Sequence, residues 1–233
     1  MTADERKARV ELAACYRLLA HFGVSDLTYN HLSARVPGEP TRLLIKSRTM
    51  MFEEVTASNL ENFDFDDPGL RGGQKVIHAG VLAARPDVHS VFHTHTTANM
   101  GVASQEQGLL MVNQHAVSFY RRIAYHEFGG FEFDPAMQGP LLRSLGDMRV
   151  ALLRNHGALI CGRTIAEAFV LHHFLEMACK GQIAALAGGS KLTLIADALC
   201  EEGARQFDAA DPVSKDWAAC LRLARRLDAS FEE

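Results

Sequence analysis

The stretch SVFHTHTTANM, Ser90 to Met100, carries the most informative pattern in the chain. It places His93 and His95 two positions apart at the end of a short apolar run. Alternate side chains of a strand lie on one face and start about 6.5–7 Å apart, so both imidazoles can reach one ion, while Thr94 points to the opposite face. The pair alone also fits two polar residues at an exposed strand end.

A third histidine strengthens the metal interpretation. His156 lies in LLRNHGALICG, where an apolar strand ends and Gly157 lets the backbone approach a neighbour closely. An imidazole in such an apolar hairpin is costly unless its ring is satisfied. Three neutral imidazoles leave a coordination position open, as catalytic metal sites do. We therefore predict that His93, His95 and His156 hold one divalent metal ion.

Helices and strands alternate irregularly around these motifs. Apolar spacing predicts helices over residues 4–21, 74–86, 96–108, 134–146 and 164–189, and a mostly helical tail. Period-2 alternation predicts strands over residues 31–36, 42–47, 87–95 and 122–128, a short strand within 54–73, and two strands over 150–162. Asp134 suits the start of one helix, and Thr164 and Glu167 have capping-box spacing.

The chain shows no linker or internal repeat. We therefore expect one layered α/β domain over residues 1–233, with a mixed sheet, a core over about 8–190 and a helical tail over about 194–233.

Composition narrows the class of protein. With 48% hydrophobic residues and a formal net charge of -4, the chain suits a soluble protein without the basic surface that nucleic acid or an anionic membrane requires. No apolar run approaches the ~18 residues of a membrane span, and the first 20 residues lack a signal-peptide pattern. The five cysteines are scattered without CxxC spacing. We expect a cytoplasmic protein with reduced thiols.

The other histidines allow two interpretations each. His78 on a predicted helix suits a core hydrogen bond or a position behind the metal ligands. His115 and His126 could face a cleft or solvent, and the pair in the long helix, His172 and His173, is predicted to be structural.

The order HAGVLAARPDVHSVFHTHT and then LLRNHGALICGRTIAEAF, with SARVPG and EEVTASNL, resembles the class II aldolase/adducin family over about residues 11–188. The resemblance implies a mixed, largely antiparallel central sheet flanked by helices. It also implies a homotetramer with active sites between subunits. It places the metal ligands on the same three histidines, with zinc as the usual ion; Mn or Fe(II) stay open because imidazole ligands alone do not decide.

The resemblance fails where sugar-phosphate aldolases carry Ser-Ser-Glu. Gly72, Gly73 and Gln74 stand there. Glutamine cannot transfer a proton as the glutamate does, and glycines offer only backbone N–H groups to a phosphate. In the corresponding phosphate loop, Thr28 matches a threonine but His31 replaces an asparagine. A sugar phosphate is therefore a disfavoured substrate.

A tyrosine that serves some aldolases as an acid corresponds to Ala116, beside His115. The predicted site thus has Gln74 and His115 as catalytic candidates. Its predicted substrate-binding residues are Thr28, His31, Gly72 and Gly73.

Three functions compete. The first is a metal-dependent lyase, acting by retro-aldol cleavage or decarboxylation on a small non-phosphorylated hydroxy or keto substrate, with His115, His31 or metal-bound hydroxide moving the proton. The second is a non-haem iron oxygenase, for which Met100, Phe119 and Tyr120 would suit an aromatic substrate. The third is a non-catalytic adducin-like binding protein. Gln74 favours the third, but three retained ligands favour the lyase, which we place first.

Overall fold

The computed structural model describes residues 1–131 and 134–233. Its centre is a seven-stranded sheet in the order β3-β2-β1-β4-β7-β6-β5. The strands are β1 (His31–Val36), β2 (Glu39–Ile45), β3 (Glu61–Asp64), β4 (Ser90–Thr94), β5 (Ile123–His126), β6 (Val150–Leu153) and β7 (Gly157–Gly162). Within the described residues β5 and β6 pair in parallel and every other neighbouring pair is antiparallel. The prediction of a mixed, largely antiparallel sheet is confirmed.

Helices cover both faces of the sheet. The α-helices of the described residues are α1 (Ala3–His21), α2 (Gly80–Ala84), α3 (Thr97–Ala103), α4 (Gln114–Val117), α5 (Gln138–Leu145), α6 (Ile165–Ala187), α7 (Asp197–Ala209) and α8 (Pro212–Leu227). A π-helix, η2 (Gln74–Ala79), leads into α2, and short 3-10 turns are η1 (Phe52–Glu54), η3 (Pro135–Met137) and η4 (Ala229–Glu232).

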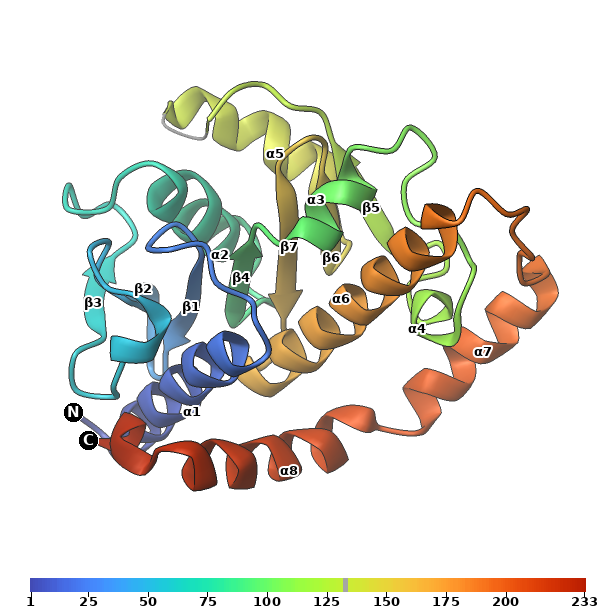
Figure 1. Ribbon diagram of the computed structural model, residues 1–233. Helices are drawn as coiled ribbons and strands as arrows, with labels where there is room; N and C mark the ends of the chain where they lie inside the picture. The colour runs from blue at the N-terminus through green and yellow to red at the C-terminus, as the bar shows by residue number, and fades with distance from the viewer. Residues whose placement is uncertain (132–133) are drawn as a thin grey trace.

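The two faces bury separate apolar clusters. Helices α1, α3, α6 and α8 pack over one face, where Leu32, Phe92 and Ile160 are fully buried, and α6 runs obliquely across the sheet (Figure 1). Helices α2 and α5 cover the other face over Val91 and Leu159. Burying each such side chain contributes about 1.5–3 kcal/mol. Because Val91 and Phe92 alternate between the clusters, His93 follows Val91 onto the α2/α5 face.

Local signals explain where the helices begin. The Thr2 hydroxyl accepts from the Glu5 N–H (3.1 Å) at the start of α1. The predicted start at Asp134 is confirmed, since its carboxylate accepts from the Ala136 N–H. The capping box at α6 forms only in half. Thr164 accepts from the Glu167 N–H, but the Glu167 carboxylate turns to the backbone N–H and guanidinium of Arg163, a charge-assisted partner.

Several elements differ from the sequence predictions in type or extent. The helix predicted from residue 74 starts as a π-helix, and α4 was not predicted. The strand predicted over 87–95 is confined to 90–94, so His95 lies just beyond it. The chain ends lie close together (Figure 1), where the Ala57 N–H donates to the carbonyl of Phe231 in η4.

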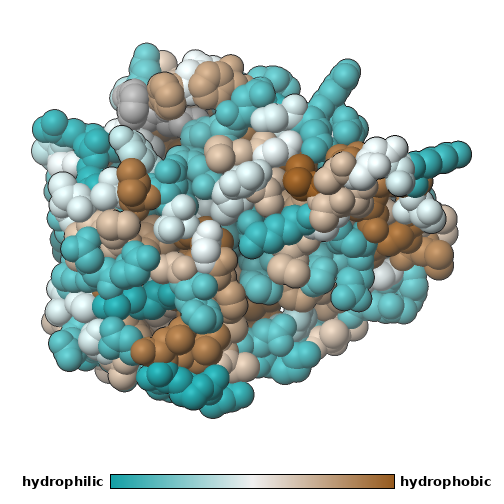
Figure 2. All heavy atoms as spheres, viewed as in Figure 1, coloured by the Kyte–Doolittle hydropathy of each residue, from teal (hydrophilic) through white to brown (hydrophobic). Residues whose placement is uncertain are grey.

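The face drawn in Figure 2 is mainly hydrophilic, with small hydrophobic patches, one at the α7 end. None of the five cysteines, which all lie within the described residues, is paired in a disulfide. In the described parts of the chain, no helix combines the length and the apolar character that crossing a bilayer demands.

Candidate metal centre

Three imidazoles converge where β4 ends and β7 begins. His93 is the last residue but one of the fully buried strand β4. His95 follows the strand, and His156 lies in the β6–β7 turn, made tight by Asn155 at φ 57°. Their ligand nitrogens all lie within 4.8 Å of one another. The His95 Nε2 is 2.9 Å from that of His93 and 3.0 Å from that of His156. Tetrahedral zinc with Zn–N bonds of 2.0–2.1 Å needs nitrogens about 3.3 Å apart, so a slight opening admits an ion.

Hydrogen bonds on the far side of two rings fix which nitrogen faces inward. The Nδ1–H of His93 donates to the Ala158 carbonyl (3.0 Å), because a carbonyl can only accept. The Nδ1–H of His95 donates to the Asp26 carboxylate (3.0 Å) in the same way. Both Nε2 atoms are thereby left as lone-pair donors toward the shared centre, the arrangement of metal-bound histidines.

Burial favours the neutral form that a ligand requires. His93 is 2% exposed. Desolvation, followed by the neighbouring His156 and His95, holds the pKa of His93 well below its usual value. A neutral imidazole in this place can bind a cation without first losing a proton. The residues present therefore fit a divalent metal ion.

The loop before β1 supports His95 twice. Besides the Asp26 contact, the Asn30 side-chain oxygen accepts from the backbone N–H of His95 (2.8 Å). Between them, Leu27 is exposed and has φ 47°, a left-handed conformation that costs a non-glycine residue about 1 kcal/mol or more. Sequence reasoning missed both Asp26 and Asn30. Their only sequence signal is a polar run before the β1 strand.

On the opposite face, α6 holds the strand end in place. The hydroxyl of Thr94 lies 2.9 Å from Nε2 of His172, and Asn99 donates to the same hydroxyl (3.1 Å). Glu176 lies one turn after His172 on α6, and its buried carboxylate accepts a hydrogen bond from the Thr96 hydroxyl (2.7 Å). His172 therefore lies behind the strand, in line with its predicted structural role.

A second histidine pair lies beside the triad. The antiparallel register places His31 opposite His93, with ring centroids 5.2 Å apart. The His31 Nδ1 is 2.6 Å from Nε2 of His78, whose Nδ1 is 2.5 Å from the Ser33 hydroxyl. Desolvation lowers the pKa of His78 to about 3. A Cβ on Gly73 would lie 3.1 Å from Nε2 of His31, so the absence of a side chain there leaves the ring its space.

Lys46 links two other predicted site residues. Its buried ammonium donates to the Thr28 carbonyl (2.8 Å), and its own carbonyl is 3.4 Å from the Gln74 amide nitrogen, which donates to it. Desolvation lowers the pKa of Lys46 to about 8. Sequence reasoning did not identify this lysine. A lysine at the end of a strand is usually exposed, and no sequence pattern indicates that the amine of Lys46 is buried.

The remaining predicted residues lie elsewhere. His115 is on α4, and its ring packs against Phe174 of α6 with centroids 5.3 Å apart. The described ring contacts of His115 include none with His93, His95 or His156. Phe119, considered for an aromatic substrate, is buried in the main core. Phe128, which was not singled out, is half exposed, and its ring stands edge-on to His156 with centroids 6.4 Å apart.

The mixed sheet with convergent imidazoles at the β4–β7 junction defines an α/β protein with a three-histidine candidate metal centre. The chain belongs to the class II aldolase/adducin family, because the family model for the Class II Aldolase and Adducin N-terminal domain matches residues 10–183.

Relatives occur on both branches of the family. A provisionally named class 2 aldolase of Pseudomonas aeruginosa is 37% identical over 236 residues, covering 95% of this chain and 90% of that protein. Alpha-adducin of Rattus norvegicus is 35% identical over 193 residues, covering 78% of this chain but 26% of the adducin.

Solved structures share the fold. An aldolase II superfamily protein from Pseudomonas syringae superposes with a TM-score of 0.94 at 37% identity, covering 100% of this chain and 98% of that one. An L-fuculose 1-phosphate aldolase from Glaciozyma antarctica gives a TM-score of 0.87 at 19% identity, covering 99% and 94%; at this identity the likeness concerns the fold.

Proposed function

We propose that this protein is a divalent-metal-dependent lyase that breaks a carbon–carbon bond, by retro-aldol cleavage or decarboxylation, in a small non-phosphorylated hydroxy or keto substrate. The observation that carries the proposal is the convergence of three Nε2 atoms, two of them oriented by acceptors on Nδ1. A divalent ion held by His93, His95 and His156, zinc by family preference or Mn or Fe(II), would polarise the substrate carbonyl and stabilise its developing oxyanion.

The substrate would lie between the triad and the loop of Gly72 and Gly73. Those glycines present backbone N–H groups without side chains, and Thr28 and His31 complete this binding surface. His31 would hold a substrate oxygen through Nε2, because its Nδ1 is already engaged by His78. Gln74 would orient the substrate through its amide, since it cannot transfer a proton.

His115 would act from a neighbouring subunit. Within its own subunit its ring packs on Phe174, and it is only partly buried. This role therefore goes together with the proposal of a cytoplasmic homotetramer with sites between subunits. Light scattering on the purified protein tests the assembly. A monomer would exclude His115 from the mechanism.

Metal analysis of untagged protein, purified without added metal, tests the centre. We expect close to one ion per chain, lost in His93→Ala and His156→Ala while the circular dichroism spectrum is retained. The matched control is His89→Ala, because His89 is exposed and its ring contacts only the Arg163 carbonyl among the described hydrogen bonds. Full metal occupancy in both triad variants would disprove the ligand assignment. Zinc- or manganese-loaded protein is then assayed for aldehyde or CO2 release from hydroxy and keto acids. Iron as the bound ion would direct the assay to O2 consumption.

A non-catalytic adducin-like role is the second candidate. The adducin similarity over 78% of the chain and the glutamine at position 74 favour it. This role predicts a protein that binds no divalent ion at micromolar concentration and releases no product, so the same metal analysis separates it from the lyase.

A further inference from the structure

Three polar side chains form a continuous hydrogen-bonded chain beside the candidate metal centre. His31 and Ser33 are alternate residues of β1 and lie on one face of the sheet, where His78 of η2 meets both. Nδ1 of His78 is 2.5 Å from the Ser33 hydroxyl, and Nε2 of His78 is 2.6 Å from Nδ1 of His31. Ser33 and His78 are fully buried. The chain therefore runs from the protein interior to the ring that packs against His93.

The Ser33 hydroxyl decides the direction of this chain. Within residues 1–131 and 134–233, its one hydrogen-bond partner is His78. The hydroxyl hydrogen therefore either points to Nδ1 of His78 or has no acceptor. His78 itself is neutral at pH 7, because desolvation lowers its pKa to about 3. A neutral imidazole carries one N–H, and its other nitrogen accepts.

Two proton arrangements fit a neutral His78. In the first, Ser33 donates to Nδ1 of His78, the Nε2–H of His78 donates to Nδ1 of His31, and His31 carries its own proton on Nε2. In the second, every hydrogen bond is reversed, and the buried hydroxyl hydrogen of Ser33 has no acceptor. Because an unpaired buried donor is costly, the first arrangement is favoured by a factor of about 5–150.

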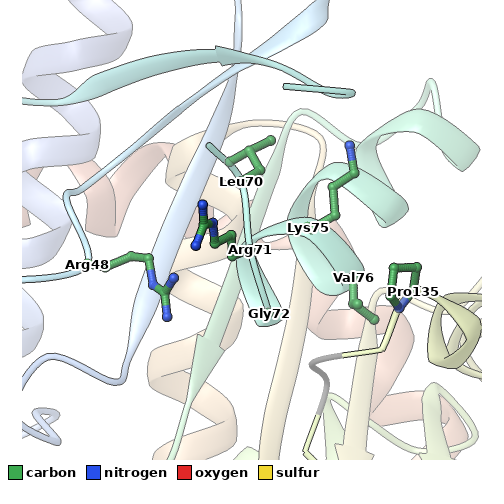
Figure 3. Close-up of a pocket in the computed structure, with 7 residues that line it drawn as sticks. All are labelled: Arg48, Leu70, Arg71, Gly72, Lys75, Val76 and Pro135. Carbon is green, nitrogen blue, oxygen red and sulfur yellow. The ribbon is translucent and has the colours of Figure 1, made fainter. Parts of the chain in front are cut away.

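The outer end of the chain is open. Nε2 of His31 forms no hydrogen bond with the described residues, and it does not belong to their buried polar atoms without a partner, so it is exposed to solvent. A Cβ on Gly73 would lie 3.1 Å from this nitrogen, so the glycine leaves the space in front of it free. The preceding residue, Gly72, lines the cavity of about 480 Å³ drawn in Figure 3. A small molecule at the triad can therefore meet the Nε2–H of His31.

We propose that Ser33 and His78 hold His31 in the tautomer that donates through Nε2–H, and that this N–H binds the substrate oxygen on which negative charge develops. His31 is then neither a base nor a fourth metal ligand, because both roles need a lone pair on Nε2. The substrate group that faces His31 is an acceptor, namely a carbonyl, carboxylate or enolate oxygen. The tautomer rests on the buried hydroxyl, whereas the role toward the substrate rests on the proposed function.

Neutron diffraction from crystals of the purified protein, exchanged into D2O, tests the direction of the chain. We expect deuterium on Nε2 of both His31 and His78, and the hydroxyl deuterium of Ser33 directed at Nδ1 of His78. Deuterium on Nδ1 of both rings would overturn the inference. This measurement needs no substrate and no substitution, so it does not depend on the proposed function.

Calorimetric titration of the zinc-loaded protein with acetohydroxamate, whose oxyanion binds metal ions, tests the role of the N–H. We expect binding to weaken at least about tenfold in His31→Phe and to recover in part in His31→Gln, whose amide can donate. Ser33→Asp should also weaken binding at least about tenfold, because a carboxylate only accepts and would reverse the chain. The matched control is Ser33→Asn, which has the same size but can still donate, and it should bind within about fivefold of the natural protein.

The outcomes separate this inference from the proposed function. Zinc content, measured in the same samples, should stay close to one ion per chain in every variant, so that weaker binding reports the N–H and not the metal. Equal binding by Ser33→Asp and Ser33→Asn, or natural binding by His31→Phe, would refute the role of His31 and leave the lyase standing. Absence of acetohydroxamate binding to the natural zinc-loaded protein would contradict both proposals.

Discussion

Gly157→Ala should force β4 and β7 apart and thereby displace the histidines of the candidate metal centre. A Cβ at this position would lie 2.4 Å from the Thr94 carbonyl oxygen and 3.0 Å from Cδ2 of His95. Since tolerated contacts begin at 3.0–3.4 Å, β4 and β7 must separate by about 0.6–1.0 Å. The obstructing atom is backbone, so no rotamer change relieves the contact. Metal–ligand distances tolerate only about 0.2 Å, and β4 leads directly into His95.

We expect Gly157→Ala to lose about 1–3 kcal/mol of unfolding free energy by overpacking and to bind zinc at least about tenfold more weakly. Urea denaturation of metal-free protein measures the first effect, and competition with a chromophoric chelator measures the second. Gly188→Ala is the matched control, because a Cβ there meets only Ser190 Oγ at 4.0 Å. If Gly157→Ala matched the natural protein in both measurements, the close approach of β4 and β7 would be refuted.

Three further substitutions test separate parts of the structure. Asp26→Asn removes the carboxylate that orients His95 and should weaken metal binding about 10–100-fold with little change in metal-free stability; unchanged affinity would show that Asp26 does not position the ring. Tyr16→Phe removes a buried hydroxyl bonded to both backbone groups of Leu32 and should cost about 1–3 kcal/mol in urea denaturation, whereas the exposed Tyr29→Phe should be neutral. Burial lowers the pKa of His172 to about 3 from an ordinary 6.5, so the unfolded chain takes up its proton first and stability is lost as pH falls from 6.5 toward 3. His172→Asn should make that decline shallower, by up to about 1.4 kcal/mol per pH unit; an identical pH profile would mean that His172 titrates normally in the folded protein.

The triad was predictable because its signals are local. His93 and His95 share a face through the period of a strand, and the Asn-His-Gly turn that carries His156 is marked by its own residues. Alternation and helical spacing likewise predicted the sheet and most helices. The short helix α4 was not predicted, because four residues are too few to show a helical period of apolar residues.

The surroundings of the triad were not predictable from spacing. Asp26 reaches His95 only because Leu27 adopts a left-handed conformation that its residue type disfavours. His31 meets His93 through strand register, which depends on pairing between distant segments. The Glu167 carboxylate left its expected cap because a neighbouring guanidinium offered a stronger partner. In each case a tertiary or electrostatic contact decided among conformations that the local sequence allowed.

The wide separation of the candidate ligands along the chain has a consequence for the stability and abundance of the protein in the cell. His95 and His156 stand 61 residues apart and meet only after β4 has paired with β7. The three histidines are not held together in an unfolded chain. A divalent ion would therefore bind almost only to the folded state and would cross-link the middle strands of the sheet. Free metal at a thousand times its dissociation constant would add about 4 kcal/mol to the unfolding free energy. In cells with little of this metal, the metal-free protein would be inactive and would also be degraded faster, because it is less stable. Its abundance would then rise and fall with the concentration of the metal.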